Sequence, residues 1–372
     1  MKRIDVFDSL RGIAIIGVIL IHSGNNVPRN FGMLAEAIIS NGNKGVQIFF
    51  IISAILFYRS FATYCNKYPD MRPEIVAAWY GKRFLRLIPL FWLTNTAVLL
   101  YSGIKDMNIS VADVKIYISN CLFLHGFIPE YINAIGNNWY IGTLAIFILL
   151  VPFIYRLVNN IWKACALFGI SWLLQQMLER TVAVLDCGQD MIIWQDYWKG
   201  FSIFKQMPVL AIGIILYFLL FHYEIHLFLY NKLVEKFGKT GAAVVLYVCF
   251  FALCGSIFYA VVTYQNIYRF AVIIGLLLIV LFCYPIPLIV NRFYSFIGKY
   301  SYGIYLFHLL LLGRINNLLT NFIDDLLINV ILATFITLFV CLFVSVVATN
   351  YFERPIINVV QAKMTKGNFQ EK

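Results

Sequence analysis

The sequence has few charged residues for its length. Only 13% of its 372 residues are Asp, Glu, Lys or Arg, whereas soluble domains carry about a quarter. It also has no internal repeat and no low-complexity tract, and its eight cysteines contain no C-x-x-C pair or metal-ligand spacing. These absences exclude an ordinary soluble domain, a repeat array and a cysteine-based framework. We therefore expect no metal cofactor.

Long apolar runs occupy most of the chain. Hydrophobic residues make up 61% of the sequence, and the mean hydropathy is +0.80. This pattern predicts an all-α, polytopic membrane protein with a single domain over residues 1–372 and a short tail from about 354. A segment at 114–128 is too short to span and is interpreted as interfacial or re-entrant. We predict ten transmembrane helices, at residues 10–24, 45–63, 85–103, 139–156, 162–179, 204–221, 242–263, 268–285, 296–313 and 326–351.

The distribution of lysine and arginine predicts the orientation of these helices. With a cytoplasmic N-terminus, the segments inside hold 18 lysines and arginines and those outside hold 9, while acids such as Asp186, Asp190 and Asp325 gather outside. Cytoplasmic loops of membrane proteins are enriched in lysine and arginine, so both termini are predicted to be cytoplasmic. The net charge of +11 is accordingly interpreted as an orientation signal, and no nucleic-acid partner is expected.

The first apolar segment, DSLRGIAIIGVILIH, carries an arginine and a histidine, which are both costly to bury in lipid. Arg11 and His22 are 11 positions apart, about three helical turns or roughly 16 Å, so they lie on nearly one face. Asp8 is predicted to cap the helix and to pair with Arg11. Alone, either residue could simply mark a membrane interface, but their shared face favours a functional role. Small residues between them permit close helix packing: Gly12, Ala14 and Gly17.

Five later segments follow in a recognisable order. They read GVQIFFIISAILFYRSF (45–61), KRFLRLIPLFWL (82–93), NNWYIGTLAIFILLVPFI (137–154), FIGKYSYGIYLFHLLLL (296–312) and FERPI (352–356). Together with Arg-x10-His in the first helix, they resemble the integral-membrane acyltransferase family 3, of the bacterial polysaccharide O-acetyltransferase type. The resemblance covers nearly the whole chain. Two positions depart from it: Ala54 replaces a usual glycine, and Leu144 replaces a usual glutamate.

The resemblance implies an enzyme of the cytoplasmic (inner) membrane that transfers an acetyl group. Its implied donor is acetyl-CoA, and its implied acceptor is a sugar hydroxyl of a cell-surface polysaccharide or a lipid-linked precursor, such as O-antigen or capsule. An alternative is a transporter or flippase for a lipid-linked glycan, which would also bury polar groups along a pathway. A glycan exporter, however, has no need for a phosphate-binding arginine pair beside a face-aligned histidine.

Acyl transfer suggests roles for four residues. His22 is interpreted as the base that activates the acceptor hydroxyl, or as the carrier of the acyl group. Arg11 is expected to guide the donor from the cytoplasm or to polarise its carbonyl. Arg83 and Arg86 suit the phosphates of CoA, although basic residues there also follow the general rule for cytoplasmic loops.

The late segment supplies a further polar face. Ser301, Tyr305 and His308 fall at i, i+4 and i+7 of one predicted helix, which indicates a cavity or a partner helix. His308 could carry a proton, contact the acceptor or simply hydrogen-bond a neighbouring helix, and we favour the last of these. Trp139 is placed at the outer membrane edge, where it could also bind a sugar. The remaining histidines are expected to be solvated or at headgroup level: His125, His222 and His226.

Overall fold

A computed structural model describes residues 5–28, 31–70, 72–106, 108–131, 138–184, 194–195, 197–264 and 266–367. Over these residues the chain is helical and contains no strand. Seven helical stretches in this part of the chain are long and apolar enough to cross a membrane. They contain α1 (Asp5–Asn25), α3 (Gly45–Lys67), α4 (Pro73–Asp106), α6 (Trp139–Leu157), α9 (Ile203–Tyr217), α10 (Ile225–Val262) and α14 (Leu326–Ala348).

The other three predicted spans also fall on helices, but these helices do not meet the same criteria. They are α7 (Ile161–Val184), α11 (Ile267–Cys283) and α13 (Ser301–Thr320). Helix α11 is apolar but short. Helices α7 and α13 carry polar side chains such as Gln175 and Asn316 along their length. A count of ten transmembrane helices therefore stays a prediction, whereas a multi-pass helical fold is confirmed.

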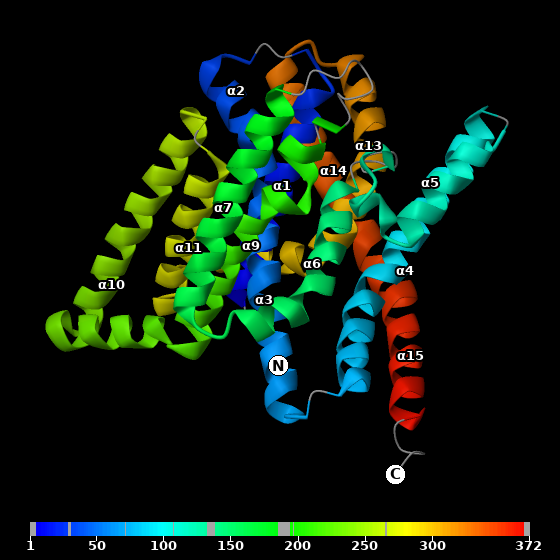
Figure 1. The fold of residues 1–372 in the computed structure, drawn as a ribbon. Helices are drawn as coiled ribbons and strands as arrows, with labels where there is room; N and C mark the ends of the chain where they lie inside the picture. Colours follow the sequence, from blue (N-terminus) through cyan, green and yellow to red (C-terminus); the bar gives the residue numbers. More distant parts are fainter. Residues whose placement is uncertain are drawn as a thin grey trace.

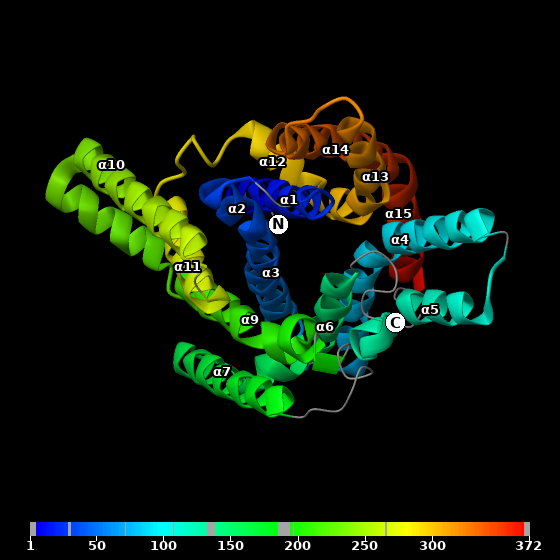
Figure 2. The same ribbon diagram turned by 90° about the horizontal axis from the view of Figure 1, so that it is seen from above.

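Helices α1 and α3 lie near the middle of the bundle when it is seen from above (Figure 2). Helices α12 (Arg292–Lys299), α13 and α14 lie on one side of α1, while α9, α10 and α11 lie on the other. Helices α4 and α5 (Val111–Cys121) project together from the bundle (Figure 1). The start of α1 and helix α15 (Arg354–Gly367) both lie in the lower half of Figure 1, so both ends of the described chain face the same side.

Two segments that the sequence placed in a loop or a tail are helical. Helix α10 already begins at Ile225 and bends at Gly238, whose φ of 67° is a conformation that glycine adopts easily. The part before this bend runs outward from the lower left of the bundle in Figure 1. The described part of the predicted tail from about residue 354 forms α15. The predicted interfacial segment 114–128 contains the end of α5 and the short turn η2 (Leu124–Gly126), neither long enough to span.

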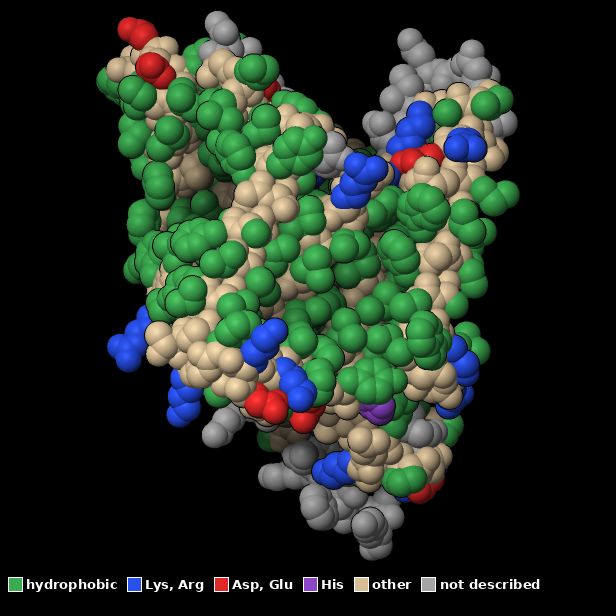
Figure 3. All heavy atoms as spheres, turned by 90° about the vertical axis from the view of Figure 1, so that its left-hand side faces the viewer, with side chains coloured by type: hydrophobic (Ala, Val, Ile, Leu, Met, Phe, Trp, Pro, Cys, Tyr) green, Lys and Arg blue, Asp and Glu red, His purple; other side chains and the backbone are tan. Residues whose placement is uncertain are grey.

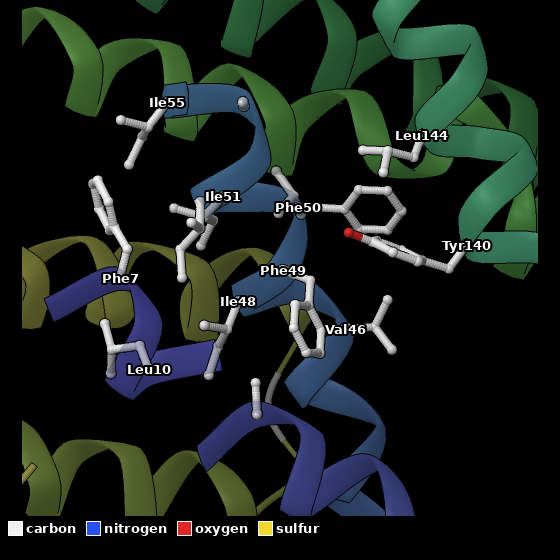
Figure 4. Close-up of a cluster of buried hydrophobic side chains, with 14 of the residues drawn as sticks. Phe7, Leu10, Val46, Ile48, Phe49, Phe50, Ile51, Ile55, Tyr140 and Leu144 are labelled. Atoms are coloured by element: carbon white, nitrogen blue, oxygen red, sulfur yellow. The ribbon is translucent and has the colours of Figure 1, made fainter. Parts of the chain in front are cut away.

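The core lies where α1, α3 and α6 meet. Phe7 and Leu10 of α1 pack against Ile51 of α3, and Phe50 of α3 lies beside Tyr140 of α6 (Figure 4). In a membrane, water does not drive such helices together, because lipid tails are as apolar as these side chains. Close van der Waals packing is therefore what holds the three helices in register.

Helix α12 approaches α1 more closely than any side chain would allow. A Cβ atom on Gly298 would overlap the backbone carbonyl of Asp8, and one on Gly12 would overlap the carbonyl of Tyr294. The close packing that the small residues of the first helix predicted is confirmed here. This contact brings Lys299, the residue after Gly298, close to the beginning of α1.

The outer surface is suited to lipid. Figure 3 shows a broad hydrophobic face on the side of the bundle formed by α10, with lysine and arginine side chains gathered mainly toward its lower edge. Exposed apolar residues on α10 include Val244, Val248, Phe251 and Phe258. An apolar face of this kind is expected for a helix in contact with acyl chains.

Candidate active site

A cavity of about 300 Å³ lies where the central helices meet. Each of the six sequence segments singled out above contributes at least one residue to its wall. Among them are Arg11, Ser53, Arg83, Arg86, Tyr140, Leu144, Ser301, Tyr305 and Glu353. We call this space the arginine cavity. Segments spread over most of the chain therefore converge on one site.

The arginine cavity is strongly basic. Four cationic side chains line it, from Arg11, Arg83, Arg86 and Lys299, and Glu353 is the one carboxylate among its described lining residues. Clefts lined by one sign of charge focus the field on a ligand of the opposite sign. Arginine in particular binds phosphate through forked hydrogen bonds. This lining is suited to a small molecule that carries several negative charges.

Packing fixes Arg83 more firmly than Arg86. The guanidinium of Arg83 hydrogen-bonds to the hydroxyl of Ser60 and lies 5.6 Å from the ring centre of Trp79. The indole nitrogen of Trp79 donates to the same hydroxyl at 3.0 Å. Arg86, one helical turn further along α4, is exposed. The two arginines thus combine a pre-organised cation with one that has room to reach a ligand.

Arg11 is paired as the sequence predicted. Its Nη1 atom lies 3.9 Å from a carboxylate oxygen of Asp8, which is buried. Asp8, however, lies within the first turn of α1 and does not precede it, because the helix begins at Asp5. The pair lies directly beside the Gly298 contact. The close approach of α12 therefore fixes the position of Arg11 at the wall of the cavity.

His22 lies outside the lining of the arginine cavity and contacts a second histidine. The ring centres of His22 and His308 are 5.3 Å apart. The ring of His308 lies 5.6 Å from that of Tyr305, and Tyr305 lies 5.4 Å from Tyr140. Tyr305 and Tyr140 both line the cavity. Four rings thus form a continuous path between the cavity and His22.

The remaining predicted site residues divide into two groups. Ser301 and Tyr305 line the arginine cavity, so this part of the predicted polar face does meet a cavity. Trp139 does not line it. Its ring packs 6.0 Å from Phe50 and 5.1 Å from Phe201, within the aromatic core between α3, α6 and the turn before α9.

Sequence reasoning missed several lining residues, among them Lys299, Tyr140 and Glu353. For Glu353 a signal was present, because it is a lone acid directly after the long apolar segment 326–351. A carboxylate placed there usually marks a functional site or a buried pair. Tyr140 had no such signal, because a tyrosine among aromatic residues is indistinguishable from a core residue.

The expectation that His125 is solvated is wrong. Its side chain is fully buried, its ring lies 5.7 Å from that of Phe91, and its Nε2 atom lies 3.3 Å from the carbonyl of Asn138. Burial lowers the pKa of His125 to about 4, so the side chain is neutral near pH 7. His222 is exposed as expected, and His226 is half-buried on α10 and packed near Phe282.

Apolar helices surrounding a basic cavity, with a pair of histidines beside it, define a multi-pass membrane protein with a strongly basic cavity among its helices. Residues 4–350 match the family model described as an acyltransferase domain. The chain therefore belongs to acyltransferase family 3 and is a membrane acyltransferase. No curated protein and no solved structure matches the chain.

Proposed function

We propose that this protein is an O-acetyltransferase of the cytoplasmic membrane. It takes an acetyl group from acetyl-CoA and transfers it to a sugar hydroxyl of a cell-surface polysaccharide or of its lipid-linked precursor, such as O-antigen or capsule. The observation that carries this proposal is the arginine cavity, where Arg11, Arg83, Arg86 and Lys299 surround one small space. Acetyl-CoA combines several phosphate charges with a reactive thioester, which suits a basic cavity connected to a histidine.

In this proposal the phosphates of CoA bind near Arg83 and Arg86. Both arginines belong to segments whose positive charge predicts the cytoplasmic side, where acetyl-CoA is made available to the enzyme. Arg11 lines the same cavity from the first half of α1. The long flexible arm of CoA directs its thioester along the face of α1 that carries His22.

His22 acts on the acceptor. As a base it removes the proton of the sugar hydroxyl, while the oxygen forms a bond to the acyl carbon and the carbon–sulfur bond breaks. The proton then passes to the CoA sulfur, so the reaction consumes no further reactant. A covalent acyl-histidine would give the same products in two steps. Arg11 is placed to stabilise the negative charge that develops on the thioester oxygen.

The test is chemical analysis of the acceptor. Surface polysaccharide from cells with and without the gene is compared by mass spectrometry and NMR. We expect sugar-linked acetyl groups to disappear when the gene is removed and to return when it is restored. Unchanged acetyl content together with normal export would overturn the proposal. If the polysaccharide is lost from the surface, but the polysaccharide that the cells still make has its normal acetyl content, a glycan transporter is supported.

A further inference from the structure

His22 and His308 come from different helices and share one ring contact. Their ring centres are 5.3 Å apart with planes tilted by 46°. His22 is half-buried near the end of α1, whereas His308 on α13 is only 1% exposed. His22 is therefore the more accessible member of the pair, and His308 is buried in the protein interior.

The hydrogen bond of His308 fixes which of its nitrogens carries a proton. Its Nδ1 atom lies 2.6 Å from the backbone carbonyl oxygen of Tyr305. A carbonyl oxygen only accepts, so Nδ1–H donates, and in the neutral ring Nε2 carries the lone pair. Nε2 is buried and has no hydrogen-bond partner within the described parts of the chain. A buried acceptor left unsatisfied is costly, which suggests that it is used when the enzyme turns over.

A network of polar side chains holds His22 opposite His308. Ser23, the residue after His22, is fully buried. The amide of Asn316 on α13 donates to the Ser23 carbonyl at 2.9 Å, and the hydroxyls of Ser23 and Thr334 on α14 share a hydrogen bond at 3.1 Å. Two helices thus anchor the end of α1 at the residue next to the reactive histidine. This arrangement limits how far His22 can move away from His308.

We infer that His308 is a positioning residue that orients His22 during acyl transfer. Its Nε2 atom accepts a hydrogen bond from the N–H group of His22, so that the other nitrogen of His22 presents its lone pair to the acceptor hydroxyl. His308 keeps its own proton on Nδ1 throughout, and the proton of the hydroxyl passes through His22 alone. This inference rests on the proposed function, because it assigns His22 the same role.

Two substitutions separate this role from simple packing. His308→Phe keeps the size and flat shape of the ring but removes both nitrogens. His308→Gln fits the ring less well, yet its side-chain oxygen can accept the hydrogen bond from His22. An orienting role predicts that kcat of the phenylalanine variant is about 100-fold or more below that of the unmodified protein. The glutamine variant should then have a kcat about tenfold or more above that of the phenylalanine variant. A packing role predicts the opposite order.

The assay uses membrane vesicles from cells whose own copy of the gene has been replaced by each variant, so that the natural acceptor is present. Radiolabelled acetyl-CoA is added, and the label that mild base releases from the glycan fraction gives kcat and KM for acetyl-CoA. We expect KM to stay within about twofold in both variants, because the arginines that bind the donor are unchanged. His125 supplies the matched control, since it is also a buried histidine bonded to a backbone carbonyl. Because His125 has only a packing role, His125→Gln should be no more active than His125→Phe.

The outcomes separate the inference from the proposed function. If the unmodified protein places no base-labile acetyl on the glycan, both are overturned. If it does so and His308→Phe is as active as His308→Gln or more active, only the orienting role is overturned. If both variants fail to fold, and therefore lose activity and donor binding together, His308 has a structural role and the inference is again overturned.

Discussion

Leu144 and Glu353 line the same cavity from elements that are far apart in the chain, α6 and the turn η6 (Thr349–Glu353). Leu144 occupies the position where the resemblance to acyltransferase family 3 implies a glutamate. The arginine cavity nevertheless contains a carboxylate, which comes from Glu353. A single negative charge among four positive ones has a predictable effect on an anionic ligand.

Glu353→Gln should strengthen the binding of CoA. In the unmodified protein the carboxylate competes with the phosphates for the same cations and repels them, so its removal should lower the Kd several-fold. Isothermal titration of the purified protein with CoA measures this change. Leu144→Glu is the matched opposite, because it adds a second carboxylate to the same cavity and should weaken binding. Equal Kd values in all three proteins would show that Glu353 does not face the donor.

Replacing either Arg83 or Arg86 by alanine should weaken binding of acetyl-CoA by about tenfold or more, because a charged hydrogen bond contributes about 1.5–3 kcal/mol. Lysine at either position should restore binding only in part, since it lacks the forked geometry. The same titration tests this prediction. Arg314→Ala is the control, because Arg314 lies over the ring of Tyr101, away from the cavity. Unchanged affinity in a folded double-alanine variant would contradict a role in donor binding.

His22→Ala should abolish transfer while leaving CoA binding largely intact, because it removes the reactive group and keeps the cationic lining. Exchanging the histidine with its neighbour, as Ile21→His with His22→Ile, rotates it by about 100° around the helix. This double variant should be as inactive as the deletion. Kinetics of glycan acetylation and a binding titration on the same preparations measure both effects. A folded His22→Ala protein with the normal rate would exclude His22 and make His308 the leading candidate for the base.

Gly298→Ala should destabilise the protein by about 1–3 kcal/mol, because the added methyl group overlaps the backbone of Asp8 and pushes α12 away from α1. Activity should fall with stability, since the same contact holds Lys299 and Arg11 at the cavity. Gly313→Ala, at a glycine with open space around it, should be neutral. Thermal unfolding in detergent, with and without CoA, compares the two variants. Equal unfolding temperatures would show that α12 adapts without cost.

Orientation in the membrane is tested with reporter fusions. Fusions after residue 372 and within residues 232–239 should report a cytoplasmic location, and one near Asp190 should report an external one, because the inside segments hold most of the lysines and arginines. Asp190, Asp186 and the last residues of the chain lie outside the described residues. An external C-terminus would contradict the predicted orientation of both ends.

The sequence predicted most of the helices and singled out several of the residues that line the arginine cavity, among them Arg11 and Arg83, for a physical reason. Long apolar runs have few alternatives to a membrane helix, and a charged residue within such a run, such as Arg11, stands out. The pairing of His22 with His308 was not predicted, because it depends on how α1 and α13 pack and leaves no trace in local spacing. The burial of His125 was missed for the same reason. A segment too short to span the membrane gives no indication of which core side chains will cover its histidine.

The contact between Gly298 and Asp8 also sets an order of events during synthesis. Helix α1 leaves the ribosome well before α12, α13 and α14, which cover it. Until they arrive, the arginine and histidine of α1 lack the neighbours that surround them in the finished protein. The histidine pair and the wall of the cavity are both incomplete until these late helices have entered the membrane. Activity is therefore acquired at the end of biogenesis, and prematurely terminated chains should be inactive however many helices they have inserted.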